Sequence, residues 1–103
     1  MIARIWKGVV PQDRAGAYID LMRSIAIPEY KGVEGNLGAW CLHRSEAGAT
    51  QVTMLTFWQD MAAIRRFAGD DPEVAKYYPF DGDFLIEMSP NVEHFEIETA
   101  NDE

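Results

Sequence analysis

The sequence predicts one α+β domain, a ferredoxin-like sandwich made of two β-α-β halves. Three observations lead to this fold class. Apolar runs of strand type and amphipathic helical segments follow one another in the order strand, helix, strand, strand, helix, strand. The 103 residues have the length of a single domain, and the 48% apolar and 25% charged content is ordinary for a globular protein. We therefore assign residues 1–98 to one domain and 99–103 to a frayed acidic tail.

The first strand is apolar on both of its faces. Residues 2–10 are rich in apolar and β-branched side chains and end at Pro11, which is typical of a strand. Alternation places Arg4 and Trp6 on one face and Lys7 on the other, so each face carries one cation among large apolar groups. That pattern is unusual for a sheet that has one face exposed to solvent. We expect helices to cover one face and a second subunit to cover the other, which predicts a homodimer.

One helix and one hairpin come next along the chain. From residue 13 to 27 the apolar side chains recur at three- and four-residue steps, which predicts a helix that Pro28 ends. Residues 37–44 and 50–58 are both strand-like, and the short loop between them predicts a β-hairpin. No linker or clear internal repeat interrupts this order.

The last third of the chain holds two predicted helices and the closing strand. Asp60 is a helix cap, and the apolar stripe after it predicts a helix that Gly69 ends. Pro72 and an acidic first turn then predict a short helix over 72–78, stopped by the proline that comes after it. Residues 92–98 form the last predicted strand.

Charge and cysteine usage exclude several classes of function. The net charge of −8 argues against a nucleic-acid footprint, which needs clustered Lys and Arg, and against an anionic membrane surface. The single cysteine, Cys41, matches no zinc or redox spacing and is expected to be a small buried hydrophobe. No apolar run approaches a membrane span, and Met1 leads into a strand pattern rather than a signal peptide. We therefore expect a cytoplasmic protein whose partners are a second copy and a small apolar molecule.

Several segments spread over most of the chain resemble one family. They are Gly32-Val-Glu-Gly-Asn-Leu-Gly-Ala-Trp40, Phe57-Trp58, Phe67-Ala-Gly-Asp-Asp71, Tyr77-Tyr-Pro79 and Val92-Glu-His-Phe-Glu96. Together they resemble the antibiotic biosynthesis monooxygenase family, and the closing segments are similar to an uncharacterised bacterial branch of it. The resemblance implies a dimeric α+β barrel in which two sheets pack face to face. Each subunit would hold a pocket between its own sheet and helices.

The resemblance is specific for fold and loose for function. Members of the family include cofactor-free oxygenases of phenolic rings, haem-degrading enzymes, lactone isomerases and proteins without known activity. The haem-degrading branch uses an Asn on the first strand, a Trp on the second helix and a His on the following short helix. The corresponding positions here hold Lys7, Phe67 and Tyr77, of which Tyr77 alone can ligate iron. The resemblance therefore disfavours haem degradation, and we expect no cofactor.

His94 is the first candidate for catalysis. On the last strand it shares a face with Glu96 and Glu98. It can act as a general base toward a phenol or an enolisable substrate, with its pKa adjusted by Glu96. The alternatives are a hydrogen-bonded structural residue at a subunit interface and a metal ligand that acts together with the two glutamates.

Aromatic residues and one lysine complete the predicted site. If Tyr77 and Tyr78 lie on a helix, only one of them faces inward, where a phenol can orient the substrate or donate a proton to developing charge. We take Tyr77 as the catalytic and Tyr78 as the substrate-binding candidate; alternatively, both close the core. Trp58 is a substrate platform or a core anchor, and Phe67 lines the pocket or the core. Lys7 can steady an anionic intermediate or pair with one of the many carboxylates.

The sequence thus predicts a small dimeric monooxygenase that acts on an aromatic or enolic molecule without an organic cofactor. A base removes a proton, and the resulting carbanion or phenolate gives an electron to O2 in a pocket that excludes water. Two alternatives stay open. One is a non-catalytic dimeric protein that binds a small hydrophobic molecule, and the other is an isomerase that uses the same base without oxygen.

Overall fold

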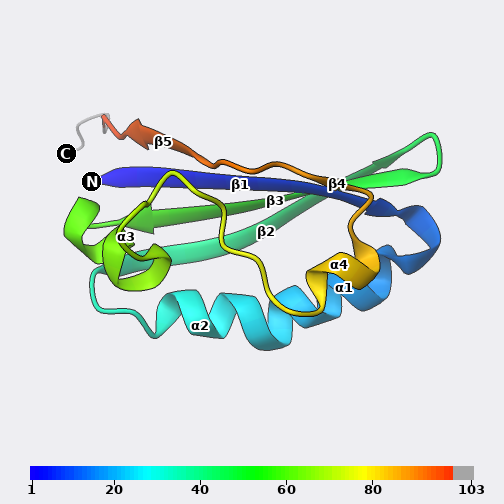
Figure 1. Ribbon diagram of the computed structural model, residues 1–103, viewed down its shortest axis with the longest axis horizontal. Helices are drawn as coiled ribbons and strands as arrows, with labels where there is room; N and C mark the ends of the chain where they lie inside the picture. The colour runs from blue at the N-terminus through cyan, green and yellow to red at the C-terminus, as the bar shows by residue number, and fades with distance from the viewer. Residues whose placement is uncertain (99–103) are drawn as a thin grey trace.

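Residues 1–98, which the computed structural model describes, form one antiparallel sheet with the helices gathered on a single face (Figure 1). The strands are β1 (Ile2–Pro11), β2 (Asn36–Glu46), β3 (Ala49–Trp58), β4 (Glu87–Met88) and β5 (Glu93–Glu96). Their order is β2-β3-β1, and the outer side of β1 pairs with both β4 and β5. The predicted ferredoxin-like α+β fold is confirmed. The predicted tail, 99–103, lies outside the described residues.

The helices form two groups beneath the sheet. Four helical segments follow one another without a break: η1 (Gln12–Arg14), α1 (Ala15–Leu21), η2 (Met22–Ala26) and α2 (Ile27–Lys31). The other two helices are α3 (Met61–Ala68) and α4 (Asp81–Phe84). None of the helices formed by residues 1–98 combines the length and the apolarity that crossing a bilayer requires.

The first helical group does not end at Pro28, as the sequence pattern predicts, but continues to Lys31. The reason is the segment η2, a π-helical turn in which the Ile27 N–H bonds to the Met22 carbonyl five residues back. After this wider turn Pro28 stands near the start of a new α-helical segment, where a missing backbone N–H costs little. A rule that assumes uninterrupted α-helical geometry therefore places the helix end too early.

Residues 72–78 do not form the predicted short helix either. They belong to an irregular segment between α3 and α4, residues 69–80, which we call the strap. The middle of the strap pairs with the chain that leads into β5. The Ala75 N–H donates to the Pro90 carbonyl at 2.9 Å, and the Val92 N–H donates to the Glu73 carbonyl at 2.8 Å. These long-range bonds satisfy the backbone groups that a helix would otherwise pair, and they override the local cap signals.

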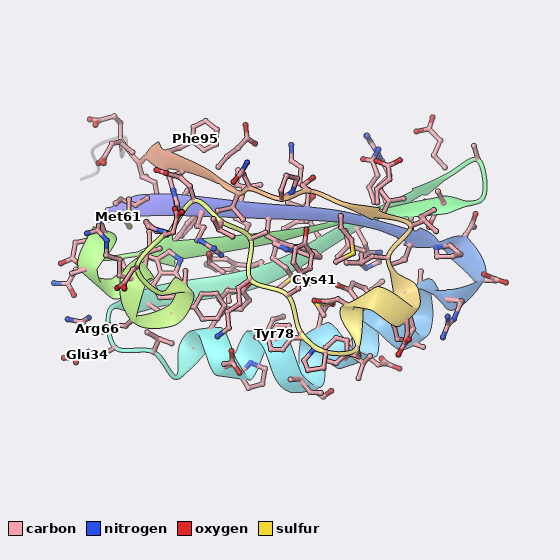
Figure 2. All side chains as sticks on the ribbon, viewed as in Figure 1. Glu34, Cys41, Met61, Arg66, Tyr78 and Phe95 are labelled. Carbon is pink, nitrogen blue, oxygen red and sulfur yellow. The ribbon has the colours of Figure 1, made fainter. Side chains whose placement is uncertain are left out.

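The two faces of the sheet differ in what covers them. On the helix side, β1 and β3 contribute large buried residues to the core: Ile2, Trp6, Val10, Val52, Met54 and Trp58. The opposite side, which we call the open face, carries Trp40, Leu42 and Phe95, which are 48%, 47% and 49% exposed. Figure 2 shows Phe95 pointing away from the helices. The core therefore lies wholly between the sheet and the helical layer.

Replacing Phe67 by Ala should lower the free energy of unfolding by about 3–5 kcal/mol. The ring is only 6% exposed and packs against Tyr30 and Trp58, with centroids 4.4 and 5.9 Å away, so truncation leaves a cavity. Chemical denaturation measures the loss. Ile86→Ala, at a position that is 59% exposed, is the control and should change the value by less than about 0.5 kcal/mol. A loss below about 1 kcal/mol for Phe67→Ala would contradict its buried position.

Candidate active site

A buried cation without an acidic partner marks the site. Arg4 lies on the helix side of β1 and is 1% exposed. None of the ion pairs formed within residues 1–98 involves it. Its Nη2 atom donates to the Val74 carbonyl of the strap at 3.4 Å, whereas its buried Nε has no hydrogen-bond partner. Burial lowers the pKa of Arg4. Because a buried charge is costly unless it is paired, this arrangement requires an explanation.

His94 faces the same side of the sheet as Arg4. The two residues are direct partners in the antiparallel pairing of β1 with β5. Facing residues in such a pair point to one side of the sheet, with Cβ atoms about 4.5–5.5 Å apart. The Nε2 atom of His94 is buried and has no hydrogen-bond partner. Burial and the neighbouring Arg4 charge lower the pKa of His94, and Glu73 offsets this only in part, so the imidazole is neutral at pH 7.

Trp6 supplies a third unpaired buried nitrogen on the same face of β1. It lies two residues after Arg4 on the same face of β1, is 4% exposed, and its indole Nε1 has no partner. The far end of its ring passes over Gly8, where an added Cβ would lie 2.8 Å from Trp6 Cη2. Three of the four buried side-chain atoms that lack a partner within residues 1–98 therefore belong to Arg4, Trp6 and His94. We call these three residues the Arg4 cluster.

Aromatic rings line the cluster. The Arg4 guanidinium lies 5.5 Å from the centroid of the Phe67 ring, which in turn packs on Tyr30. Burial, opposed by the Arg4 charge, raises the pKa of Tyr30 to about 12, so its hydroxyl stays protonated at neutral pH. Tyr77 packs edge-on against Trp6, with ring centroids 5.9 Å apart. The surroundings thus combine flat apolar surfaces with N–H and O–H donors.

The strap covers the cluster and is fastened to α2. Figure 1 shows it crossing from the sheet to the helical layer between α3 and α4. Glu29 of α2 holds two of its residues, accepting hydrogen bonds from Lys76 Nζ at 3.1 Å and from the Tyr78 hydroxyl at 3.0 Å. Figure 2 places Tyr78 between the strap and α2. Since Arg4 is almost fully buried, a ligand can reach it only when covering residues move aside.

Hollows on the surface lie elsewhere. One of about 280 Å³ opens on the open face between β1, β3 and β4, where Lys7, Gln51, Thr53 and Glu87 line it. Another of about 180 Å³ runs between the first helical group and the edge strand β2, beside Cys41. Neither contains a residue of the Arg4 cluster. We place the site by its unpaired buried groups, because an open hollow exposes ligands to water and screens charges.

The sequence-predicted residues divide into two groups. Three of them, His94, Tyr77 and Phe67, lie in or beside the Arg4 cluster. Tyr77 also donates its hydroxyl to the Ser89 carbonyl, so its phenol is already engaged. Its pKa is raised, mainly by burial. Tyr77 therefore acts on the cluster chiefly as an aromatic wall against Trp6.

The other predicted residues do not touch Arg4, Trp6 or His94 directly. Lys7 is on the open face, where it forms a 3.7 Å ion pair with Glu93. Trp58 is fully buried in the core and donates its indole N–H to the Thr56 hydroxyl at 2.8 Å. Tyr78 stacks on Phe80 of the strap with centroids 5.4 Å apart. The structure therefore does not bring these three to one site.

The metal hypothesis finds no geometry to support it. Within residues 1–98, no three His, Cys, Asp or Glu side chains are grouped so that they could hold a metal ion. His94 and Glu96 do share a side of β5, but the pKa of His94 responds to Arg4 and Glu73 and not to Glu96. The charged group that acts most strongly on His94 is thus the Arg4 cation and not a carboxylate.

Arg4, Trp6 and Tyr30 are the residues that sequence reasoning missed as site residues. Alternation already placed Arg4 and Trp6 on one face of the first strand. The sequence pattern did not reveal that β1 pairs with β5. This pairing brings His94 opposite Arg4. Tyr30 lies beyond Pro28, in the part of the helix that the pattern did not predict.

Comparisons with known proteins agree with the fold. A family model described as antibiotic biosynthesis monooxygenase matches residues 1–72. A conserved protein from Methanosarcina mazei is 19% identical in sequence, with a TM-score of 0.70 over 94% of this chain and 92% of that one. A monooxygenase from Streptomyces coelicolor, solved with nanaomycin D, is 15% identical, with a TM-score of 0.63 over 99% of this chain and 91% of that one.

A further solved structure contains a metalloporphyrin. It is an MhuD mutant with two manganese protoporphyrin IX molecules bound per active site, 17% identical over 100% of both chains with a TM-score of 0.62. The comparison with curated protein sequences found no match. At these identities the structural likeness shows the fold alone. The family model covers well over half of the residues, and on that basis the chain belongs to the antibiotic biosynthesis monooxygenase family.

Proposed function

We propose that the protein is a monooxygenase that oxidises a small aromatic or enolic molecule at the Arg4 cluster, without an organic cofactor. One observation carries the proposal: a neutral histidine with a free, buried Nε2 faces a buried arginine that has no acidic partner. Membership of a monooxygenase family supports the reaction class.

The first step is removal of a proton from the substrate by His94. A neutral imidazole can accept a proton at Nε2, and its basicity suits acid–base catalysis near neutral pH. Loss of the proton leaves a carbanion or phenolate on the substrate. The Arg4 guanidinium stabilises this charge, since a fixed cation in a buried, water-poor site acts more strongly than one in water.

Dioxygen is then the only co-reactant needed, provided that the reacting carbon bears two hydrogens. The anion transfers an electron to O2, and recombination of the two radicals forms a C–O bond to a peroxide. The proton held by His94 returns to the outer oxygen. Loss of the second hydrogen as a proton, with cleavage of the O–O bond, leaves a carbonyl group and releases water. The carbon gives up four electrons and each oxygen atom gains two, so no reductant is required.

A non-catalytic binding protein is the second candidate. The observation that favours it is the covering of the cluster, because Arg4 is 1% exposed and the strap is held by several hydrogen bonds. Such a closed site suits retention of a ligand as well as it suits exclusion of water from a reaction.

We also propose that two copies pair through the open face. Trp40, Leu42 and Phe95 are each about half exposed there, and half-buried apolar residues of β1 and β3 lie between them. A contiguous apolar sheet face of this kind is typical of a protein interface. Two sheets that pack face to face would bury it and leave the Arg4 cluster on the outer, helix-covered side of each sheet.

Replacing Trp40 by Asp should convert a dimer into monomers, because it introduces a charge into the apolar open face. Sedimentation at micromolar concentration measures the change. Ile25→Asp is the matched control, since Ile25 is 41% exposed on the helical layer and should not affect association. Sedimentation of the unaltered protein as a stable monomer would overturn the dimer proposal.

Replacing His94 by Gln should reduce turnover by about a hundredfold or more, the usual contribution of acid–base catalysis. Oxygen uptake with quinol- or anthrone-like substrates measures turnover. His43→Gln, at the exposed second histidine on β2, is the control and should retain full activity. Equal activity of His94→Gln and the unaltered protein would exclude the base role. Conversion of substrate without oxygen uptake would instead indicate an isomerase.

His94 should also make stability depend on pH. Its folded-state pKa is lowered, so below about pH 6.5 the unfolded chain binds a proton that the folded chain does not. The stability that the neutral His94 side chain contributes is thus fully present above that pH. It is lost as the pH falls toward the folded-state pKa. The free energy of unfolding should therefore drop more between pH 7.5 and 5.5 in the unaltered protein than in His94→Gln. Asp81, whose pKa is raised, acts equally in both proteins and cancels in the difference. Identical pH profiles would contradict a lowered folded-state pKa of His94.

A further inference from the structure

We infer that the Arg4 cluster is an anion site, which binds a planar aromatic or enolic ligand through a negatively charged oxygen more tightly than a neutral molecule of the same shape. The inference rests on the proposed location of the site and specifies the ligand class: a ring or conjugated plane that carries a carboxylate, or an enolate or phenolate oxygen once His94 has taken its proton.

The first argument is the charge balance of the buried groups. Arg4 is the only residue of the cluster that carries a fixed charge, and no carboxylate within residues 1–98 forms an ion pair with it. Glu73 is the acidic group that acts on His94, and it is an exposed residue of the strap. Burying an unpaired cation costs several kcal/mol, and a bound anion supplies the missing partner.

The second argument is the match between the free donors and an oxyanion. Arg4 Nε and Trp6 Nε1 are donors that cannot accept, and both are buried without a partner. They lie two residues apart on one face of β1, about 7 Å along the strand. Native proteins leave few buried donors unpaired, so two such donors beside an unpaired cation indicate an acceptor-rich ligand.

The third argument concerns the shape of the ligand. The rings of Phe67, Tyr30 and Tyr77 border the cluster, and each is buried or half-buried. They offer flat apolar surfaces next to the donors. A small polar anion such as phosphate would leave these surfaces unused, whereas a planar anion with a ring or conjugated system contacts both parts.

The net charge of the protein makes the inference testable. With a net charge of −8, non-specific electrostatics repel anions and favour a neutral ligand. A preference for an anion over a neutral molecule of the same shape must therefore come from a local group. Benzoate and benzamide form such a pair, because they differ in charge and hardly in size.

The experiment measures the affinities of benzoate and benzamide at pH 7 by calorimetry in the absence of oxygen. The unaltered protein should bind benzoate about tenfold or more tightly than benzamide, which is the effect of one charge-assisted hydrogen bond. Arg4→Met should lose this preference. Because Arg4→Met also removes an unpaired buried charge, its melting temperature without ligand should be unchanged or higher. Arg65→Met, at an exposed arginine on α3, is the matched control and should keep the preference.

A second measurement does not depend on the Arg4 variant. In a nitrogen–proton correlation spectrum, benzoate should shift the Trp6 indole N–H signal, assigned by its loss in Trp6→Phe, and benzamide should shift it less. Equal affinity for the two probes, a preference that survives in Arg4→Met, or no binding of benzoate at millimolar concentration would each overturn the inference. Oxygen uptake is a separate readout. Benzoate preference without turnover of any substrate would refute the monooxygenase proposal alone, and turnover without benzoate preference would refute the anion site alone.

Discussion

Pairing of the central strand β1 on both of its sides determines where the functional side chains of this protein lie. All ten residues of β1 pair with β3, and its first half also pairs with β5. Because facing residues in antiparallel strands point to the same side of the sheet, this register brings Arg4 and His94 together from opposite ends of the chain. The same alternation places Lys7 on the other side. One register therefore separates the proposed reaction site from the proposed subunit interface.

The fold could be predicted from the sequence because local patterns and long-range pairing agree for most of the chain. The hairpin of β2 and β3 and the strand β1 follow from alternation and turn residues alone. The closing strand is shorter than the predicted 92–98, spanning Glu93–Glu96, and the short elements α4 and β4 were not predicted. Two further errors arose where a distant partner or an irregular turn changed the outcome. The π-helical turn before Pro28 lets a helix pass a proline, and the pairing of the strap with residues 90–92 replaces a helix whose cap signals were all present. Local rules assess only neighbouring residues and cannot weigh such features.

The candidate site was predictable only in part, for a related reason. His94 stood out by its chemistry, and Phe67 by its place on a helical stripe. Arg4 did not stand out, because one arginine in a strand usually reaches solvent or finds a carboxylate. Its significance depends on two facts that follow only from the three-dimensional structure: it is 1% exposed, and it has no acidic partner among the described residues. The unusual feature of Arg4 is thus that it lacks the carboxylate partner that a buried arginine usually has.

The close approach of Trp6 to Gly8 has an evolutionary consequence. Any side chain at position 8 would begin 2.7 Å from Leu85 Cδ2 and 2.8 Å from the indole, so both neighbouring side chains would have to shift to admit it. The two positions should therefore change together among descendants of this protein: a side chain gained at 8 forces the indole to move or to be replaced. Since that indole carries one of the free N–H groups of the proposed anion site, drift at a glycine with no polar group to offer would change the donors that this site presents.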